Sequence, residues 1–188
     1  GVVGAFLKRE DLVVSTHRAH AHYLAKGGGL PALIAELHGR VTGCTRGRGG
    51  SMNLTDREAG FVASTAIVGN TIPIGVGLAL AQLLKKTDNI VVVYFGDAAV
   101  EEGAYYEALS FAALKKLPVL FICENNLYSV NTALELRQPA ERKIYEMSRA
   151  IGVKSDSLDG NDALGMLPSV QNVISKVRRG DGPWLLEL

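Results

Sequence analysis

Two polar residues in the sequence follow runs of apolar residues, and together they could hold a metal ion. Asp97 comes soon after the apolar run NIVVVYF, and Asn126 comes soon after the run LPVLFIC. A carboxylate and an amide oxygen are hard ligands that suit Mg²⁺, which keeps other positions for water and phosphate oxygens. The alternative is two independent turns, where aspartate and asparagine are common. If the two runs form neighbouring strands, Asp97 and Asn126 converge on one crevice.

The residues next to Asp97 could approach a phosphate group. Ala98 and Ala99 are small, so backbone N–H groups there can come close to phosphate oxygens, and a helix that follows would offer its positive end. Glu101 and Glu102 are the only paired carboxylates nearby. We expect them to be favourable charges at the start of that helix rather than an acid/base pair.

The spacing of apolar residues predicts an α/β fold with an open, mainly parallel sheet and helices on both faces. Strands are predicted at 11–16, 89–95, 117–123 and 183–188, with a weaker fifth at 154–160. Helices are predicted at 30–39, 72–86, 104–116, 138–152 and 167–180. The strand runs are continuous rather than alternating, as in a sheet covered on both faces. Ligands of such sheets bind beyond the carboxyl ends of the strands, which is where Asp97 and Asn126 fall.

Bulk composition limits the classes of protein to consider. The chain has 188 residues, 47% of them hydrophobic, which suits one folded domain, 1–188, and excludes disorder. A formal net charge of +1 implies no broad attraction to nucleic acid, and no apolar run is long enough to span a membrane. Cys44 and Cys123 lie in unlike settings, so we expect no disulfide and a reducing compartment. Because the chain stops straight after a predicted strand, we expect it to lack N- and C-terminal segments of a longer subunit.

Several motifs together resemble one family. Gly96-Asp97-Ala98, then 26 residues, then Asn125-Asn126 resembles the thiamine-diphosphate-binding motif, usually written GDG…NN. The other stretches are HRAHAHYLAKGG (17–28), RGRGGSMN (46–53), AIVGNTIPIGVGLALA (66–81) and ALSFAALKKLPVLFICENNLYS (108–129). In this order they resemble the alpha subunit of thiamine-diphosphate-dependent 2-oxo acid dehydrogenases, the decarboxylating first component. The GGSM loop is similar to the pyruvate and acetoin types, and less so to the branched-chain type.

The resemblance implies a thiamine-diphosphate-binding fold with a metal site. Asp97 and Asn126 would bind Mg²⁺ through their side chains, and Tyr128 through its backbone carbonyl. The residues implied to bind thiamine diphosphate are His17, Arg18, Ala66, Val68, Gly96, Asp97, Ala98, Ala99 and Asn126.

Individual roles follow from the same resemblance. Arg18 matches an arginine that binds the diphosphate, and a guanidinium suits phosphate oxygens bidentately. Ala66 and Val68 match positions whose backbone carbonyls receive the aminopyrimidine ring. His20 matches a catalytic histidine beside the reacting end of the cofactor, as a proton donor or oxyanion stabiliser.

Three residues depart from the family pattern. Ala98 stands where the motif has glycine, and its methyl group is tolerable only if its φ is negative. His17 replaces the usual tyrosine and keeps a hydrogen-bond donor. Asn53 replaces a histidine after Ser-Met, which removes a possible proton carrier. We expect cofactor binding to be retained, because both side-chain metal ligands are present.

The resemblance also implies partners. In the family, the beta subunit supplies the glutamate that activates the pyrimidine ring, so the chain would hold one side of a site in a heterotetramer of two alpha and two beta subunits. The acyl group derived from a small 2-oxo acid or acetoin would pass to a lipoyl-bearing acyltransferase component. We expect a cytoplasmic protein, or one of the mitochondrial matrix in a eukaryote, with no nucleic acid or membrane partner.

Other interpretations remain open. A non-catalytic homologue could act as a binding or scaffold subunit, and the N-terminal half of a split transketolase would share the cofactor motif. TRGRGGS could contact RNA, although it is a single copy without nearby aromatic residues. His17, His20 and His22 have alternating spacing that could suit zinc, although no cysteine or acidic residue lies beside them.

Overall fold

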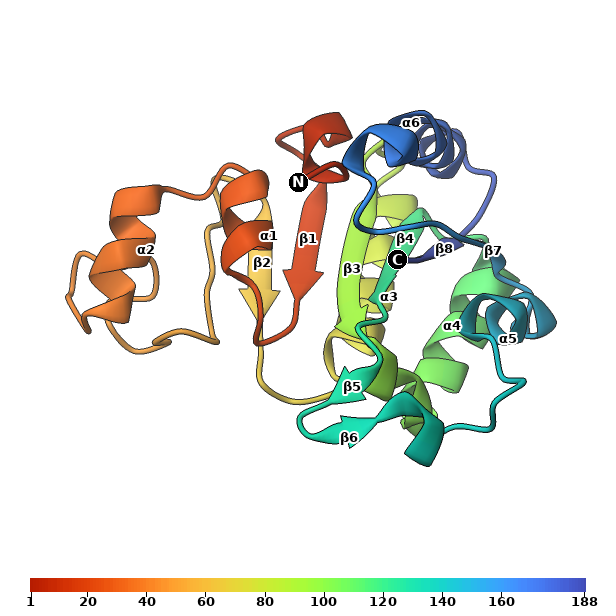
Figure 1. The fold of residues 1–188 in the computed structure, drawn as a ribbon. Helices are drawn as coiled ribbons and strands as arrows, with labels where there is room; N and C mark the ends of the chain where they lie inside the picture. Colours follow the sequence, from red (N-terminus) through yellow and green to blue (C-terminus); the bar gives the residue numbers. More distant parts are fainter.

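The computed structural model describes residues 1–188, and a six-stranded sheet forms its centre (Figure 1). The strands are β1 (Leu12–Ser15), β2 (Phe61–Ser64), β3 (Val91–Gly96), β4 (Val119–Glu124), β5 (Tyr128–Ser129), β6 (Thr132–Ala133), β7 (Lys154–Ser157) and β8 (Trp184–Glu187). The α-helices are α1 (His20–Ala25), α2 (Leu30–Leu37), α3 (Thr71–Leu84), α4 (Gly103–Lys115), α5 (Ile144–Ile151) and α6 (Ala163–Arg178). Short 3-10 helices are η1 (Gly4–Phe6), η2 (Asp97–Glu101) and η3 (Leu134–Leu136).

The main sheet has the strand order β2-β1-β3-β4-β8-β7, and every neighbouring pair is parallel. β5 and β6 form a separate antiparallel hairpin. The predicted α/β class with an open parallel sheet is therefore confirmed. The weaker predicted strand at 154–160 is also present, as β7.

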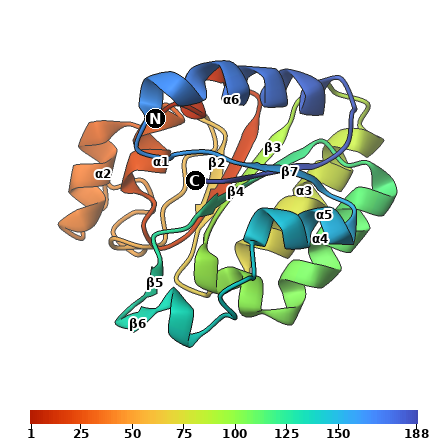
Figure 2. The ribbon, with the colours of Figure 1, turned by 45° about the vertical axis from the view of Figure 1, so that its right-hand side comes forward.

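Helices cover both faces of the sheet because alternate strand residues point to opposite sides. Val93 and Phe95 pack in one core cluster with residues of α3 and α4, whereas Val92 and Tyr94 pack in the other with α6. Figure 2 shows α6 on the side opposite α3, α4 and α5. None of these helices has both the length and the apolar composition needed to cross a membrane.

Local sequence signals explain which face of α4 is buried and where α5 ends. α4 buries Tyr105, Ala108, Leu109 and Ala112, the face expected from 3.6-residue spacing. Gly152 ends α5 with a φ of 104°, a left-handed conformation that favours glycine. The predicted helix 138–152 begins only at Ile144. Before it, the Arg142 N–H donates to the Pro139 carbonyl at 2.9 Å in a turn, and Gln138 Nε2 donates to the Asp97 carbonyl at 3.4 Å.

The strand β2 and the helix α1 were not predicted, nor were the hairpin strands β5 and β6 or the 3-10 helices, and α6 was predicted to start too late. β2 is only FVAS, too short and too weakly apolar to be seen as a strand. α1 is a six-residue helix rich in histidine. α6 begins at Ala163 rather than at 167, because the Asp162 side chain accepts a hydrogen bond from the Gly165 N–H (2.9 Å) and caps the helix.

Candidate functional site

The ends of β3 and β4 bring the two predicted metal ligands together. The strands are neighbours, with Gly96 opposite Glu124, so Asp97 and Asn126 both follow the carboxyl edge of the sheet. Both residues line one cavity of about 330 Å³. The other lining residues that the sequence pointed to are Arg18, Gly96, Ala98 and Tyr128. The predicted crevice therefore exists at this edge.

Asp97 is almost completely buried, yet only one of its two carboxylate oxygens accepts a hydrogen bond. It is 2% exposed, and its Oδ2 accepts a hydrogen bond from Nη2 of Arg137. Arg137 Nη1 also reaches Glu101 Oε1 at 2.5 Å, and Gln138 Nε2 donates to the same oxygen at 3.0 Å. No hydrogen bond reaches Asp97 Oδ1. One oxygen of a buried carboxylate is therefore free to bind a cation.

Arg137 stays charged in this setting. Burial on its own would lower the pKa of the Arg137 guanidinium, but the hydrogen bond and charge of Asp97, with the charge of Glu101, raise it. The guanidinium thus neutralises one side of Asp97. Sequence reasoning assigned Glu101 to the following helix only, and the structure corrects this, because Glu101 also holds Arg137.

Two further oxygens at the cavity suit a hard cation. Asn126 Oδ1 accepts the Tyr128 N–H at 3.0 Å, which leaves its second lone pair available. Leu134 N–H donates to the Leu127 carbonyl at 2.8 Å, so the next pair of the hairpin, Tyr128 and Ala133, is of the non-hydrogen-bonded kind. The Tyr128 carbonyl is therefore not used by the hairpin. With Asp97 Oδ1, this donor set fits Mg²⁺.

Arg18 supplies positive charge to the same cavity. Its side chain is exposed and makes no ion pair or hydrogen bond, although its backbone N–H donates to Thr16 Oγ1 at 3.2 Å. An unpaired guanidinium beside a cavity lined by Gly96 and Ala98 suits an anionic group such as a phosphate.

Ala98 causes no backbone strain. It lies in η2 and is not among the residues with positive φ, so its methyl group is tolerated where the family motif has glycine. Because η2 begins at Asp97, the helix α4 starts six residues after Asp97 rather than directly after it.

The 330 Å³ cavity lined by Asp97 and Asn126 is called the main cavity here, and a smaller pocket of about 50 Å³ adjoins it. It shares Thr16, Gly96 and Ala98 with the main cavity, and it is also lined by His17, Val68 and Ala99. Ala66 is exposed and lies outside both linings. Of the nine residues implied to bind the cofactor, only Ala66 is thus absent from this pair of pockets.

His20 does not line either pocket. It begins α1, and its Nε2 lies 3.0 Å from both the carbonyl oxygen and the hydroxyl of Ser51. A carbonyl oxygen can only accept, whereas a hydroxyl can donate or accept, so both contacts are satisfied together when Nε2 carries the proton. His20 Nδ1 has no hydrogen-bond partner. Nδ1 is therefore the ring nitrogen of His20 that is left without a partner.

His22 is a site residue that sequence reasoning missed. It lines the main cavity and is buried, with Nδ1 2.8 Å from Ser15 Oγ and Nε2 2.9 Å from Glu124 Oε1. Its ring stacks on Tyr94 at 3.8 Å. His20 and His22 thus have different partners, and no group of three His, Cys, Asp or Glu side chains could hold a metal ion. The zinc interpretation is wrong.

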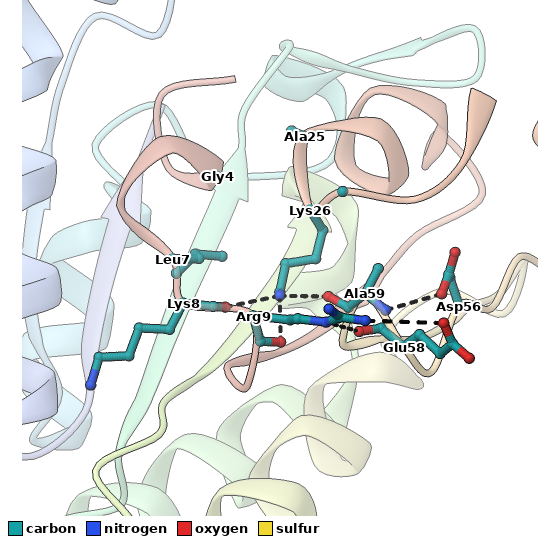
Figure 3. Close-up of a pocket in the computed structure, with 10 residues that line it drawn as sticks. Gly4, Leu7, Lys8, Arg9, Ala25, Lys26, Asp56, Glu58 and Ala59 are labelled. Carbon is teal, nitrogen blue, oxygen red and sulfur yellow. Dashed lines mark hydrogen bonds and ion pairs between the residues drawn. The ribbon is translucent and has the colours of Figure 1, made fainter.

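A larger cavity, of about 530 Å³, lies at the opposite end of the strands (Figure 3). Lys26 reaches into this region and donates to the backbone carbonyls of Lys8, Arg9 and Ala59 at 3.0, 3.0 and 2.6 Å. Burial lowers the pKa of the Lys26 ammonium, but three carbonyls satisfy its three protons. Lys26 joins three segments and is a structural contact.

Comparisons with known proteins identify the family of this chain. A model of the family described as "dehydrogenase E1 component" matches residues 2–188. The chain is 40% identical over 181 residues to the alpha subunit of the pyruvate dehydrogenase E1 component of Rickettsia bellii. It is 37% identical over 185 residues to the alpha subunit of acetoin:2,6-dichlorophenolindophenol oxidoreductase of Bacillus subtilis. These matches cover 96% and 98% of this chain.

The chain spans about half the length of the curated relatives it matches, since each of these two matches covers 55% of the relative. Among solved structures, a protein from Mycobacterium smegmatis described as a thiamin diphosphate-dependent enzyme has a TM-score of 0.62 and 18% identity. That match covers 100% of this chain and 30% of the other. This structural likeness shows that the two proteins share a fold.

Proposed function

The chain belongs to the dehydrogenase E1 component family, and we propose that it is the metal- and diphosphate-binding part of an alpha subunit. The subunit would use thiamine diphosphate and Mg²⁺ to decarboxylate a 2-oxo acid such as pyruvate, or to cleave acetoin. Because the chain spans about half of its relatives, the activity would belong to the whole subunit with its partner.

One observation carries this proposal. The buried Asp97 carboxylate keeps Oδ1 free at the same cavity as Asn126, the Tyr128 carbonyl and the unpaired Arg18. Three oxygen donors and the Arg18 guanidinium in one cavity suit a magnesium–diphosphate group, because the metal and the arginine would neutralise the phosphate charge together.

The residues would divide the work as follows. Asp97, Asn126 and the Tyr128 carbonyl would hold the metal, and Arg18 would bind the diphosphate. The backbone at Ala98 can approach phosphate oxygens, because only a methyl group stands in the way. The smaller pocket, with His17, Val68 and Ala99, would take part of the organic end of the cofactor, and Ala66 would contribute only through its backbone.

When bound, thiamine diphosphate supplies the carbanion chemistry that breaks the bond beside the substrate carbonyl. The chain's own contribution would be orientation and proton transfer. His20 donates Nε2–H to Ser51, so it would accept or return a proton at Nδ1. His20 lines neither pocket, so substrate and the partner subunit would complete the site on this side.

The relatives indicate the class of partner and substrate. Those from Rickettsia bellii and Bacillus subtilis are named as alpha subunits of pyruvate- and acetoin-acting enzymes. We propose a beta subunit as partner, in a heterotetramer, and a lipoyl-bearing acyltransferase as acceptor of the acyl group.

An assay of the full subunit, reconstituted with a beta subunit, tests the function. With thiamine diphosphate and Mg²⁺ present, we expect turnover of pyruvate or acetoin coupled to reduction of an artificial dye, and its loss in Asp97→Asn. Turnover of neither substrate, despite cofactor binding, would favour the non-catalytic homologue instead.

A further inference from the structure

A second buried carboxylate, Glu36, lies at the end of α2 and organises the glycine-rich loop. Glu36 is 0% exposed. Its Oε2 accepts the N–H groups of Thr45 and Gly47, each at 2.9 Å, and its Oε1 accepts those of Gly49 and Gly50 at 2.8 and 3.1 Å. Four backbone donors thus converge on one carboxylate, and no ion pair forms there.

The loop follows this path because glycines allow it. Gly47 has a φ of +75°, which a side chain would strain. A Cβ on Gly49 would lie 1.9 Å from the Asn53 carbonyl oxygen. The loop can therefore wrap closely around Glu36 and present its N–H groups inward.

The far end of the loop is fixed by a different residue. Ser64 Oγ in β2 donates to the Met52 carbonyl at 2.7 Å and accepts from the Leu54 N–H at 2.9 Å. Ser51 therefore lies between two anchors, Glu36 on one side and Ser64 on the other. Its carbonyl and hydroxyl are the groups that meet His20 Nε2.

We infer that Glu36 is a positioning residue for His20: it holds the loop so that the Ser51 carbonyl keeps the His20 proton on Nε2 and leaves Nδ1 free. The use of Nδ1 in proton transfer rests on the proposed function, but the fixed tautomer does not. Glu36 itself touches neither pocket.

Glu36 is ionised at neutral pH. Burial on its own would raise the pKa of the Glu36 carboxyl, but hydrogen bonds from Thr45, Gly47 and Gly49 outweigh it and lower the pKa to about 2. Because folding lowers this pKa, the ionised form stabilises the folded loop above the ordinary value near 4.5. That stabilisation is lost as the pH falls toward about 2.

Nitrogen-15 NMR of the histidine rings in the full subunit, without cofactor or metal, tests the inference. His20→Gln assigns the His20 signals. In the wild type we expect the Nε2–H tautomer at neutral pH. In Glu36→Gln the side-chain amide nitrogen would face backbone N–H donors, which weakens the hold on the loop. We then expect a mixture of His20 tautomers. We also expect the backbone amide hydrogens of Gly47, Gly49 and Gly50 to exchange about tenfold faster.

Glu58→Gln is the matched control, because the Glu58 side chain is 91% exposed; it should change neither signal. A folded Glu36→Gln protein that keeps both the wild-type tautomer and slow exchange would overturn the inference. If that variant does not fold, the wild type still decides. An Nδ1–H tautomer at His20, or a Glu36 carboxyl that titrates near 4.5, would overturn it. Cofactor binding plays no part in these readouts, so failure of the proposed function would leave them unchanged.

Discussion

Two buried aspartate–arginine pairs lie at opposite ends of the same sheet. Asp11 precedes β1 and is 0% exposed, and Asp97 follows β3 and is 2% exposed. Arg178 binds both oxygens of Asp11 (2.9 and 2.7 Å), and the N–H groups of Ile90 and Lys8 donate to the same carboxylate at 2.9 and 2.7 Å. Arg137, in contrast, binds only Oδ2 of Asp97.

The difference separates a structural pair from a binding site. Asp11 has both oxygens occupied by donors from three segments, so it joins those segments and has no capacity for a ligand. Asp97 has an equally buried carboxylate whose second oxygen is free at a cavity. A parallel sheet places ligands at its carboxyl edge, and only the aspartate at that edge is incompletely bonded.

The largest effect is expected from Asp11→Asn. The change leaves the Arg178 guanidinium without a carboxylate and puts an amide N–H₂ against other donors, so the free energy of unfolding should fall by about 3–5 kcal/mol. Urea unfolding measures it. Asp88→Asn, at an exposed partner of Lys8, is the control and should cost far less. A loss no larger than the control's would mean that Asp11 is not a structural pair.

Asp97→Asn should destabilise the fold less, by about 1–2 kcal/mol, because one charge-assisted hydrogen bond is lost while Arg137 keeps Glu101. The same urea experiment applies. If Asp97→Asn cost as much as Asp11→Asn, the two pairs would be energetically alike and the distinction between them would fail.

Arg137→Gln sharpens the distinction, because Arg137 orients Asp97 from the side away from the free oxygen. Partners that orient a metal ligand typically contribute tenfold or more in affinity, so Mg²⁺ affinity in the reconstituted subunit should fall by about tenfold. Arg142→Gln is the control, because Arg142 bonds to the Tyr106 hydroxyl instead. Tighter Mg²⁺ binding in Arg137→Gln would show that the guanidinium competes with the metal.

The smallest effect concerns the hairpin that precedes Arg137. Val130 is 85% exposed and has a φ of 54°, which is costly for a β-branched residue. Val130→Gly should raise the free energy of unfolding by about 0.5–1 kcal/mol, net of the greater freedom of glycine in the unfolded chain. Val41→Gly, at an exposed residue without positive φ, should not stabilise the protein. Equal gains from the two changes would show that the turn at Val130 is not strained.

The parts of the fold that the sequence could predict are those with local signals. The runs ending at Phe95 and Cys123 are continuously apolar, which indicates buried parallel strands. Adjacent parallel strands bring Asp97 and Asn126 to one edge. The short strand β2 has no such run, because two of its four residues are alanine and serine.

The contacts that tune the site could not be predicted, because each depends on residues far apart in the chain. Arg137 follows Asp97 by 40 positions and comes directly after the 3-10 helix η3. Glu36 falls within the predicted helix 30–39, and nothing in the neighbouring residues shows that four backbone N–H groups of the following loop donate to it. The family resemblance supplied Arg18 and Tyr128, which residue types alone did not mark.

We propose above that Asp97, with Oδ1 free, holds the metal that binds the cofactor. Calorimetric titration of thiamine diphosphate into the full subunit, reconstituted with a beta subunit, tests it directly with and without Mg²⁺. We predict binding that requires Mg²⁺ in the wild type and is lost in Asp97→Ala. No binding in the wild type, or unchanged affinity in Asp97→Ala, would contradict the claim.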